Sequence, residues 1–289
     1  MIVTIFYHVD NFCKEFEKKL LPNKKSVGPK PRMTLSEIMT IAIYFHYSKL
    51  RTFKDYYQRI RTWYRGYFNR LVSYNRFVEL MQTILVPLTM FQLFCLSFST
   101  KTGIYFIDST KLVICHNKRI YSHKVFKGFA QRGKDSTGWF YGFKLHFIIN
   151  ENGEIMSFAL TPGNTSDKNI DLVKQMAKDL TGKMFGDRGY ISQPLFEELA
   201  SKGLKLFTTL RKNMKGCLVN MSDKLMQKKR GLIETVNNVL KNTFYVEHSR
   251  HRSVTNFVVN IISSLLAYFF KPDKPSIYKA LKHIESNHA

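Results

Sequence analysis

The pattern that most constrains this chain is an alternation of short apolar segments with helical segments, which begins near residue 103. Turn signals such as Asn152-Gly153 and Pro162-Gly163-Asn164 separate the apolar runs. Strands alternating with helices at this spacing favour an α/β fold with a partly parallel sheet. We expect strands at 104–107, 143–149, 155–160, 183–186 and 204–210, and helices at 166–180, 194–202, 228–242 and 254–270.

The residues before about 98 indicate a run of short helices. Thr34 and Glu37 form a T-x-x-E capping box ahead of an apolar helical pattern, and Ser73 can cap a later helix. We therefore divide the chain into three parts. These are a helical DNA-binding region at 1–100, a catalytic domain at 101–245, and a helical extension at 246–289 that packs on the catalytic domain.

Positive charge is distributed along the whole chain. There are 45 Lys and Arg against 21 Asp and Glu, so the formal net charge is +24. The excess is +9 in residues 1–100, +12 in 101–242 and +3 in 243–289. This balance favours a polyanionic partner, and nucleic acid is the first candidate.

Three classes of protein are disfavoured by the remaining composition. The four cysteines have no C-x-x-C pair, which fits neither a disulfide scaffold nor a thiolate zinc site, and we expect reduced, buried thiols. The longest apolar run, 257–270, is too short to span a bilayer, and the N-terminus does not resemble a secretory signal. We expect a cytoplasmic protein that does not bind membranes. The cysteines are Cys13, Cys95, Cys115 and Cys217.

Two aspartates occupy positions typical of an active site. Asp108 follows the strand expected at 104–107, and Asp187 follows the one at 183–186. Ligands gather at the carboxyl ends of strands in open α/β sheets, so both side chains can project into one crevice. Taken singly, each is more often a turn or helix cap, and the pair makes that interpretation weaker.

Glu234 can supply a third carboxylate from the helix expected at 228–242. At about 100° per residue, Gln227, Arg230, Glu234 and Lys241 fall on one polar stripe of that helix. An ordinary ion pair four residues apart is the alternative interpretation, and Gly231 can mark a helix start. Three converging carboxylates favour two Mg²⁺ or Mn²⁺ ions, which suit phosphodiester chemistry.

The chain resembles the DDE-type transposases of bacterial insertion sequences nearly end to end. The resemblance rests on the stretches 107–110 (I-D-S-T), 123–128 (H-K-V-F-K-G), 132–134 (R-G-K), 138–139 (G-W) and 186–190 (G-D-R-G-Y). It implies an RNase H-like mixed sheet with flanking helices, in which Asp108, Asp187 and Glu234 are the catalytic and metal-binding residues. Their spacings of 79 and 47 residues carry more weight than any single motif.

One group of these transposases has a Y-x2-R-x3-E-x6-K signature around the glutamate. Arg230, Glu234 and Lys241 match its spacing, whereas Gln227 stands where the tyrosine would be. This departure weakens assignment to that group and any role for residue 227. The resemblance implies that Arg230 and Lys241 hold phosphates at the cut end of the DNA.

Further cations are candidates for contact with the DNA backbone. In residues 56–70, aromatic side chains are interleaved with arginines, which suits phosphate binding and stacking; a core helix with a solvated basic face is an equally good interpretation. A second basic block lies near residues 118–134, where a solvated loop is the alternative. The candidate DNA-binding residues are Arg59, Arg61, Arg65, Arg119, Lys124, Lys127, Arg132, Lys134, Arg188, Arg230 and Lys241.

Several neighbouring polar residues receive weaker interpretations. We expect His146 to be a partly buried imidazole with a satisfied partner, and Lys144 can face the crevice from the same strand. Asp167 is expected to be a helix cap, with a supporting position beside the active site as the alternative. The histidines do not indicate a zinc site.

The leading hypothesis is a Mg²⁺- or Mn²⁺-dependent transposase that cuts double-stranded DNA at the terminal repeats of its element and joins the ends to target DNA. Asp108 would bridge two metal ions, with Asp187 and Glu234 holding one each. A homodimer is favoured because two ends are handled together, and the site of action would be the bacterial cytoplasm at the nucleoid. A structure-specific nuclease, or a non-catalytic repressor derived from a transposase, are the alternatives.

Overall fold

The structure, a computed structural model, describes residues 1–20, 31–209, 220–247 and 251–278. The chain forms two compact units. Unit 1 comprises Met1–Ser97 and Val239–Lys271. Unit 2 comprises Phe98–Asn238 and the described residues after Lys271.

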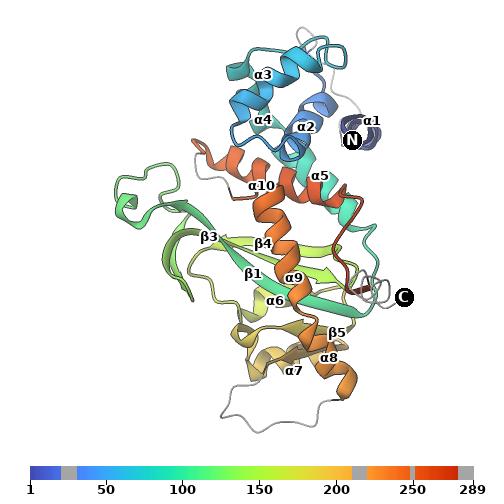
Figure 1. Ribbon diagram of the computed structural model, residues 1–289, viewed down its shortest axis with the longest axis vertical. Helices are drawn as coiled ribbons and strands as arrows, with labels where there is room; N and C mark the ends of the chain where they lie inside the picture. Colours follow the sequence, from blue (N-terminus) through green and yellow to red (C-terminus); the bar gives the residue numbers. More distant parts are fainter. Residues whose placement is uncertain (21–30, 210–219, 248–250, 279–289) are drawn as a thin grey trace, which may run out of the picture. The chain divides into compact units, whose positions relative to one another are not determined.

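Unit 1 is built from helices, as the sequence predicts (Figure 1). The capping box is present, because the Thr34 side chain accepts from the backbone N–H of Glu37 and the Glu37 carboxylate accepts from that of Thr34. Ser73 caps its helix in the same way. The helices are α1 (Ile2–Leu20), α2 (Leu35–Tyr44), α3 (Phe53–Trp63), α4 (Tyr74–Thr83), α5 (Leu85–Leu96) and α10 (Val254–Phe269), with a 3-10 turn at Phe45–Tyr47 and a π-helical turn at Val239–Thr243.

The apolar helix α10 packs against α5, α2 and α4, within unit 1. Most of its side chains are buried, including Phe257, Leu265 and Tyr268. This grouping differs from the predicted division, in which residues 246–289 pack on the catalytic domain. The reason is that the N-terminal helices supply the apolar partners for α10, which chain order alone does not reveal.

Unit 2 contains a six-stranded mixed sheet. β1, β3 and β4 are antiparallel neighbours, while β5 and β6 run parallel to β1 on its other side, so the order is β4-β3-β1-β5-β6 with β2 as an added strand on β3. The predicted mixed sheet with flanking helices is confirmed. The strands are β1 (Ile104–Cys115), β2 (Gln131–Asp135), β3 (Gly138–Asn150), β4 (Ile155–Pro162), β5 (Gly182–Gly186) and β6 (Leu204–Thr208).

One face of this sheet is covered by α6 (Ile170–Met176) and α7 (Gln193–Ser201). Tyr105 and Ile107 of β1 point to this face, where they share a core with Val173 and Leu195. Since successive side chains of a strand alternate, Phe106 and Asp108 point to the opposite face. The helix α9 (Gly231–Asn238), which follows α8 (Met221–Lys228), contacts β1.

The strands extend further than their apolar runs indicate. β1 continues through Asp108 to Cys115, because antiparallel pairing with β3 holds residues 105–115 in extended geometry. The edge strand β2, rich in charge, was not predicted, and α6 begins later than expected. The last residue of the strand predicted at 204–210 lies outside the described residues.

The described cysteines are free: Cys13 and Cys95 are buried, as expected, whereas Cys115 is half-buried. Cys217 lies outside the described residues. Among the described helices, no single one is long and apolar enough to cross a bilayer, although α4 and α5 together, with a 60° bend between them, reach that length and composition.

Candidate active site

The two aspartates predicted as catalytic lie at equivalent positions of neighbouring parallel strands. β1 and β5 pair at Phe106↔Phe185, which is their last parallel pair. Asp108 and Asp187 are each two residues beyond it, where β5 has ended and β1 continues. The structure therefore brings both residues to the carboxyl end of β5, with Asp108 inside its strand rather than following it.

Burial dominates the electrostatics of Asp108. Burial is the main reason that the pKa of this carboxyl is raised to about 6, and the negative charges of Asp187 and Asp167 act in the same direction. The backbone N–H of Ser109, which donates to Asp108 Oδ1 over 2.8 Å, and the charge of Arg230 act in the opposite direction. Asp108 thus lies within electrostatic reach of two acids and one guanidinium.

Asp187 begins the 3-10 turn Arg188–Tyr190, and its Oδ1 accepts from the backbone N–H of Gly189 over 2.8 Å. A Cβ on Gly189 would lie 2.9 Å from Asp187 Oδ1 and 3.5 Å from Asp167 Oδ2, so a side chain at this position would displace the Asp187 carboxylate. Tyr190 is fully buried beneath them. Burial raises its pKa well above the usual value, and the charges of Asp167, Asp108 and Asp187 raise it further, which places all three acids around one ring.

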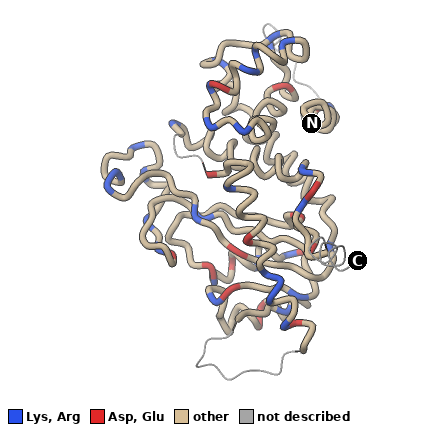
Figure 2. The backbone as a smooth tube through the Cα atoms, viewed as in Figure 1, with Lys and Arg blue, Asp and Glu red and all other residues tan. Residues whose placement is uncertain are grey.

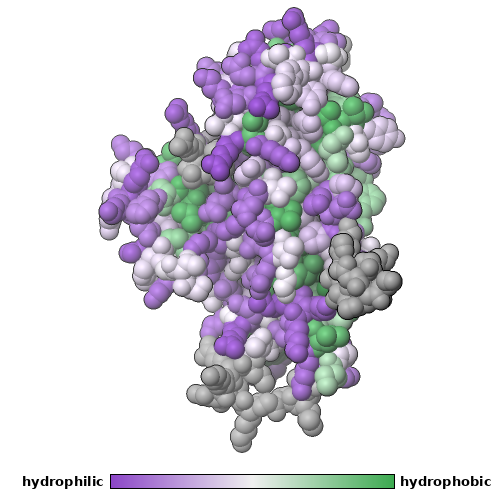
Figure 3. All heavy atoms as spheres, in the orientation of Figure 1, coloured by the Kyte–Doolittle hydropathy of each residue, from purple (hydrophilic) through white to green (hydrophobic). Residues whose placement is uncertain are grey.

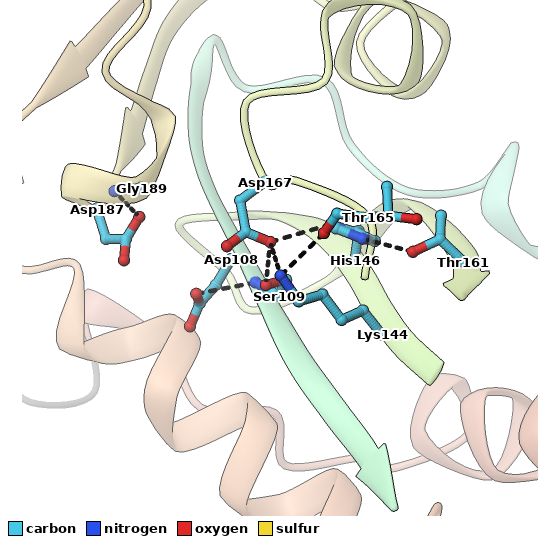
Figure 4. Close-up of polar contacts among 9 residues, drawn as sticks. All are labelled: Asp108, Ser109, Lys144, His146, Thr161, Thr165, Asp167, Asp187 and Gly189. Atoms are coloured by element: carbon cyan, nitrogen blue, oxygen red, sulfur yellow. Dashed lines mark hydrogen bonds and ion pairs between the residues drawn. The ribbon is translucent and has the colours of Figure 1, made fainter. Parts of the chain in front are cut away.

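A polar network lies on the reverse face of β1, directly behind Asp108 (Figure 4). The Ser109 hydroxyl donates to Asp167 Oδ1 over 2.7 Å, and the Lys144 ammonium donates to the same oxygen over 3.1 Å. Lys144 also donates to the Thr165 carbonyl over 3.0 Å. The Lys144 side chain is only 12% exposed, so this ion pair is largely shielded from solvent. Lys144 therefore lies on the face of the sheet opposite to Asp108, so the expectation that it faces the crevice of the two catalytic aspartates is not met.

His146 stands beside this network on β3. Its Nε2 is 2.9 Å from the Thr161 hydroxyl, and its Nδ1 is 3.9 Å from Asp167 Oδ1. Burial lowers the pKa of His146 to about 4, so the ring is neutral at neutral pH and forms no ion pair with Asp167. This confirms the expectation of a buried imidazole with a satisfied partner.

Asp167 is the functional-site residue that sequence reasoning undervalued. It was expected to cap the following helix, but Asn169 occupies that position and accepts from the backbone N–H of Leu172. The Asp167 carboxylate instead reaches across to β1 and β3. No local signal distinguishes these outcomes, because Asp167 and Asn169 are both good capping residues within three positions of each other.

The structure does not bring Glu234 to the two aspartates. Its carboxylate pairs with Arg230 over 2.9 Å, one helical turn away, and the side chain is 61% exposed. Among the described residues, no group of three or more His, Cys, Asp or Glu is arranged to hold a metal ion. The pair on the helix has the geometry of the alternative interpretation, an ordinary ion pair four residues apart.

The predicted polar stripe is interrupted by the local geometry of the chain. Gln227 lies on α8, and Gly231 begins the separate helix α9, as its sequence position suggested. Beyond Val239 the backbone adopts π-helical geometry, so 100° per residue no longer applies before Lys241, whose ammonium pairs with Glu247 over 3.4 Å. Of the four residues of the predicted stripe, only Arg230 and Glu234 therefore lie together, one helical turn apart.

Gln227, which replaces the tyrosine of the signature, ties α8 to the ends of two strands. Its Nε2 donates to the Gly186 carbonyl over 3.0 Å and to the Thr209 hydroxyl over 3.1 Å. Gly186 immediately precedes Asp187. Residue 227 therefore fixes the helix segment that leads to Arg230 against the strand end that carries Asp187.

Apart from Arg188, the remaining predicted DNA-binding cations of unit 2 lie on a projecting loop and edge hairpin between β1 and β3 (Figure 2). Arg132 and Lys134 of β2 flank the half-exposed ring of Trp139, with Cζ 4.7 Å and Nζ 5.6 Å from its centroid. Hydrophilic side chains cover this projection on the face seen in Figure 3. Its exposed cations are Arg119, Lys124, Lys127, Arg132 and Lys134, and Arg188 is exposed beside Asp187.

The cations predicted in the N-terminal region belong to unit 1. Arg59 and Arg61 are exposed on α3, and Arg65 is exposed just after it, while Tyr56 and Tyr57 of the same helix are buried. Arg59 lies over the exposed ring of Trp63, with Cζ 5.3 Å from its centroid. The helix thus has the geometry of the second interpretation, a core face of tyrosines with a solvated basic face, and phosphate binding by its arginines stays a prediction.

The carboxylates of Asp108 and Asp187 suit a divalent cation. Both are hard oxygen donors, and burial with mutual repulsion makes the ionised state of Asp108 costly unless positive charge is added. Mg²⁺ or Mn²⁺ would supply that charge. Glu234 could become a metal ligand only if its ion pair with Arg230 were broken first.

Comparisons with known proteins give one family match. The family described as "Transposase DDE domain" matches residues 98–254, more than half of the chain. No curated protein matches.

Several solved structures are similar at low sequence identity. A piggyBac transposase synaptic complex with hairpin DNA is 13% identical, with 98% of this chain and 82% of that chain covered at a TM-score of 0.41. A Mos1 mariner paired end complex with Mn is 12% identical, with 91% and 85% covered at 0.24. An intasome of simian T-cell lymphotropic virus, in complex with a PP2A regulatory subunit, is 14% identical at 0.32; the match covers 56% of this chain and spans about half, 48%, of the viral chain.

Proposed function

Because this chain belongs to the transposase DDE domain family, we propose that it cuts DNA at the ends of its own element and joins the freed strands to target DNA. The observation that carries this proposal is the pairing of Asp108 and Asp187 at equivalent positions of parallel strands. Their site combines partly buried carboxylates with nearby positive charge, which suits a metal-dependent reaction on a polyanion.

Asp108 and Asp187 would hold the divalent cations, with Glu234 as the further ligand that the resemblance implies. When bound, such ions activate a water or a 3′-hydroxyl and stabilise the leaving oxygen of the phosphodiester. The chain's part is to keep Asp108 ionised and oriented. The Ser109 backbone N–H fixes one carboxylate oxygen, and Arg230 supplies positive charge next to the carboxylates.

The net charge of +24 supports a double-stranded DNA partner. We assign phosphate contacts to the cations of the β2 hairpin and its loop, to Arg188, and to Arg230 and Lys241; those of α3 would contact the terminal repeats. Such contacts make affinity fall steeply with salt, by roughly the number of phosphates neutralised in a log–log plot. A homodimer in the cytoplasm, at the nucleoid, remains part of the proposal.

The deciding experiment uses linear DNA that carries the sequences flanking this gene. Wild-type protein and its Asp108→Asn variant are incubated with it in Mg²⁺ or Mn²⁺, and the products are sized on a denaturing gel and probed for joined strands. We expect cuts at the element ends and joined products with the wild type alone. Cuts without joining would favour a nuclease, and specific binding without cuts would favour a repressor.

A further inference from the structure

We propose that Asp167 is a positioning residue for Asp108 and that it acts through Ser109. The inference deepens the proposed function and rests on it. Asp167 is not part of the predicted triad and does not cap α6. Its carboxylate instead accepts hydrogen bonds from Ser109 and Lys144, immediately behind a proposed catalytic carboxylate.

Ser109 is held from both faces of the sheet. Its backbone N–H donates to Asp108 Oδ1 over 2.8 Å, and its hydroxyl donates to Asp167 Oδ1 over 2.7 Å. Adjacent residues of a strand point to opposite faces, so the hydrogen-bonded route from Asp167 to Asp108 runs through the backbone of Ser109. Ser109 provides that connection (Figure 4).

Asp167 is itself held in place. Lys144 donates to its Oδ1 over 3.1 Å and to the Thr165 carbonyl over 3.0 Å, which fastens the turn after β4 to β3. Ser109 and His146 are cross-strand partners, and His146 bonds to Thr161 of β4. The hydroxyl of Ser109 therefore meets an acceptor that Lys144 of β3 also holds, and a twist of β1 at Asp108 would break a charge-assisted hydrogen bond.

Groups that orient metal ligands typically change metal affinity or activity by about 10- to 100-fold when removed. We therefore expect Ser109→Ala and Asp167→Asn to raise the Mn²⁺ concentration for half-occupancy by about this factor. Ser109→Thr keeps the hydroxyl and is expected to stay close to wild type. Asp171→Asn, in the exposed first turn of α6, is the matched control for loss of one negative charge.

The test measures Mn²⁺ binding to the full chain without DNA, from the electron paramagnetic resonance signal of the free ion. Cleavage is then followed over a range of Mn²⁺ concentrations, and salt-dependent DNA binding is recorded for each variant. The expected pattern is weaker Mn²⁺ binding and slower cleavage that recovers at high Mn²⁺, with DNA binding unchanged. Circular dichroism verifies folding; if Asp167→Asn does not fold, the Ser109 pair decides.

Two results would overturn the inference alone. One is wild-type Mn²⁺ binding and cleavage by Ser109→Ala, and the other is a Ser109→Thr variant as weak as Ser109→Ala, since the hydroxyl would then be irrelevant. A wild-type protein that neither binds Mn²⁺ nor cuts the element ends would instead overturn the proposed function, and the inference with it.

Discussion

Asp167 and Glu234 flank the same proposed centre and are held in opposite ways. Asp167, on the α6 face of the sheet, accepts from Ser109 and from a largely buried Lys144. Glu234, on α9, is 61% exposed and pairs only with its helical neighbour Arg230 among the contacts described. We infer that the strand-borne part of the proposed site is ordered before metal or DNA binds, whereas Glu234 would have to leave Arg230 to join it.

The largest effect should come from removing the strand-borne carboxylates. Asp108→Asn and Asp187→Asn are each expected to lower the cleavage rate at element ends by at least about a thousand-fold, since metal ligands supply several kcal/mol of transition-state stabilisation. DNA binding should stay within about two-fold, because neither residue is a phosphate-binding cation. Single-turnover cleavage assays and salt titrations of binding measure the two quantities, with Asp171→Asn as control.

If both variants still cut DNA, the catalytic role proposed for the two strand-borne aspartates would be wrong. The site would then lie elsewhere in unit 2, and the equivalent register of Asp108 and Asp187 would have no catalytic meaning.

The second prediction concerns the free energy of unfolding as a function of pH, measured in chelator. The pKa of Asp108 is about 6 in the folded protein against 3.8 in the unfolded chain, so the folded state binds the proton more tightly. Stability should therefore rise as the pH falls from above 6 towards 4, by up to about 3 kcal/mol. Asp108→Asn mimics the neutral form, so it should be more stable than wild type at pH 8 and lose this part of the pH dependence.

Chemical denaturation at pH 8, 6 and 5 tests this. An unchanged pH profile in Asp108→Asn would mean that Asp108 ionises without cost, and the strand-borne half would not be strained in the metal-free state. Added Mg²⁺ should restore wild-type stability at pH 8, which the variant should not share.

Some features of the fold and of the proposed site could be predicted from the sequence, and others could not. Local signals were sufficient for the capping box at Thr34, for the strand β5 and for the helix start at Gly231, because each depends on neighbours in the chain. The mixed α/β sheet and the placement of Asp108 and Asp187 near the ends of strands were predicted from the α/β pattern and the family resemblance, whereas the order of the strands was not.

Other features depend on contacts that no local pattern contains. The extension of β1 through Asp108 is imposed by β3, and the charged strand β2 forms by edge pairing. Asn169 caps α6 in place of Asp167, whose carboxylate accepts hydrogen bonds from Ser109 and Lys144, both distant in sequence. The assumption of uniform helical rotation failed at the π-helical turn before Lys241.

The third prediction compares how much Asp167 and Glu234 contribute to the free energy of unfolding. Asp167→Asn leaves Lys144 without its carboxylate in a site where the ammonium is 12% exposed, so it should lower the free energy of unfolding by about 1–2 kcal/mol. A drop in thermal unfolding temperature of several degrees is the expected readout. The double variant with Lys144→Met should recover part of the loss, because no unpaired charge remains; no recovery would show that the ion pair is not what holds the turn.

The smallest expected change in stability is that of Glu234→Gln. Exposed ion pairs four residues apart on a helix contribute only about 0.3–0.5 kcal/mol, so denaturation should barely distinguish this variant from wild type. Its proposed role nevertheless requires that cleavage be lost. A stable, DNA-binding but inactive Glu234→Gln protein would show that the Glu234 side chain takes part in catalysis without stabilising the fold. This is the contrast with Asp167 that the comparison implies. Retained cleavage would remove Glu234 from the reaction and leave Asp108 and Asp187 as its proposed acidic residues. A stability loss above about 1 kcal/mol would instead make the Arg230 pair structural.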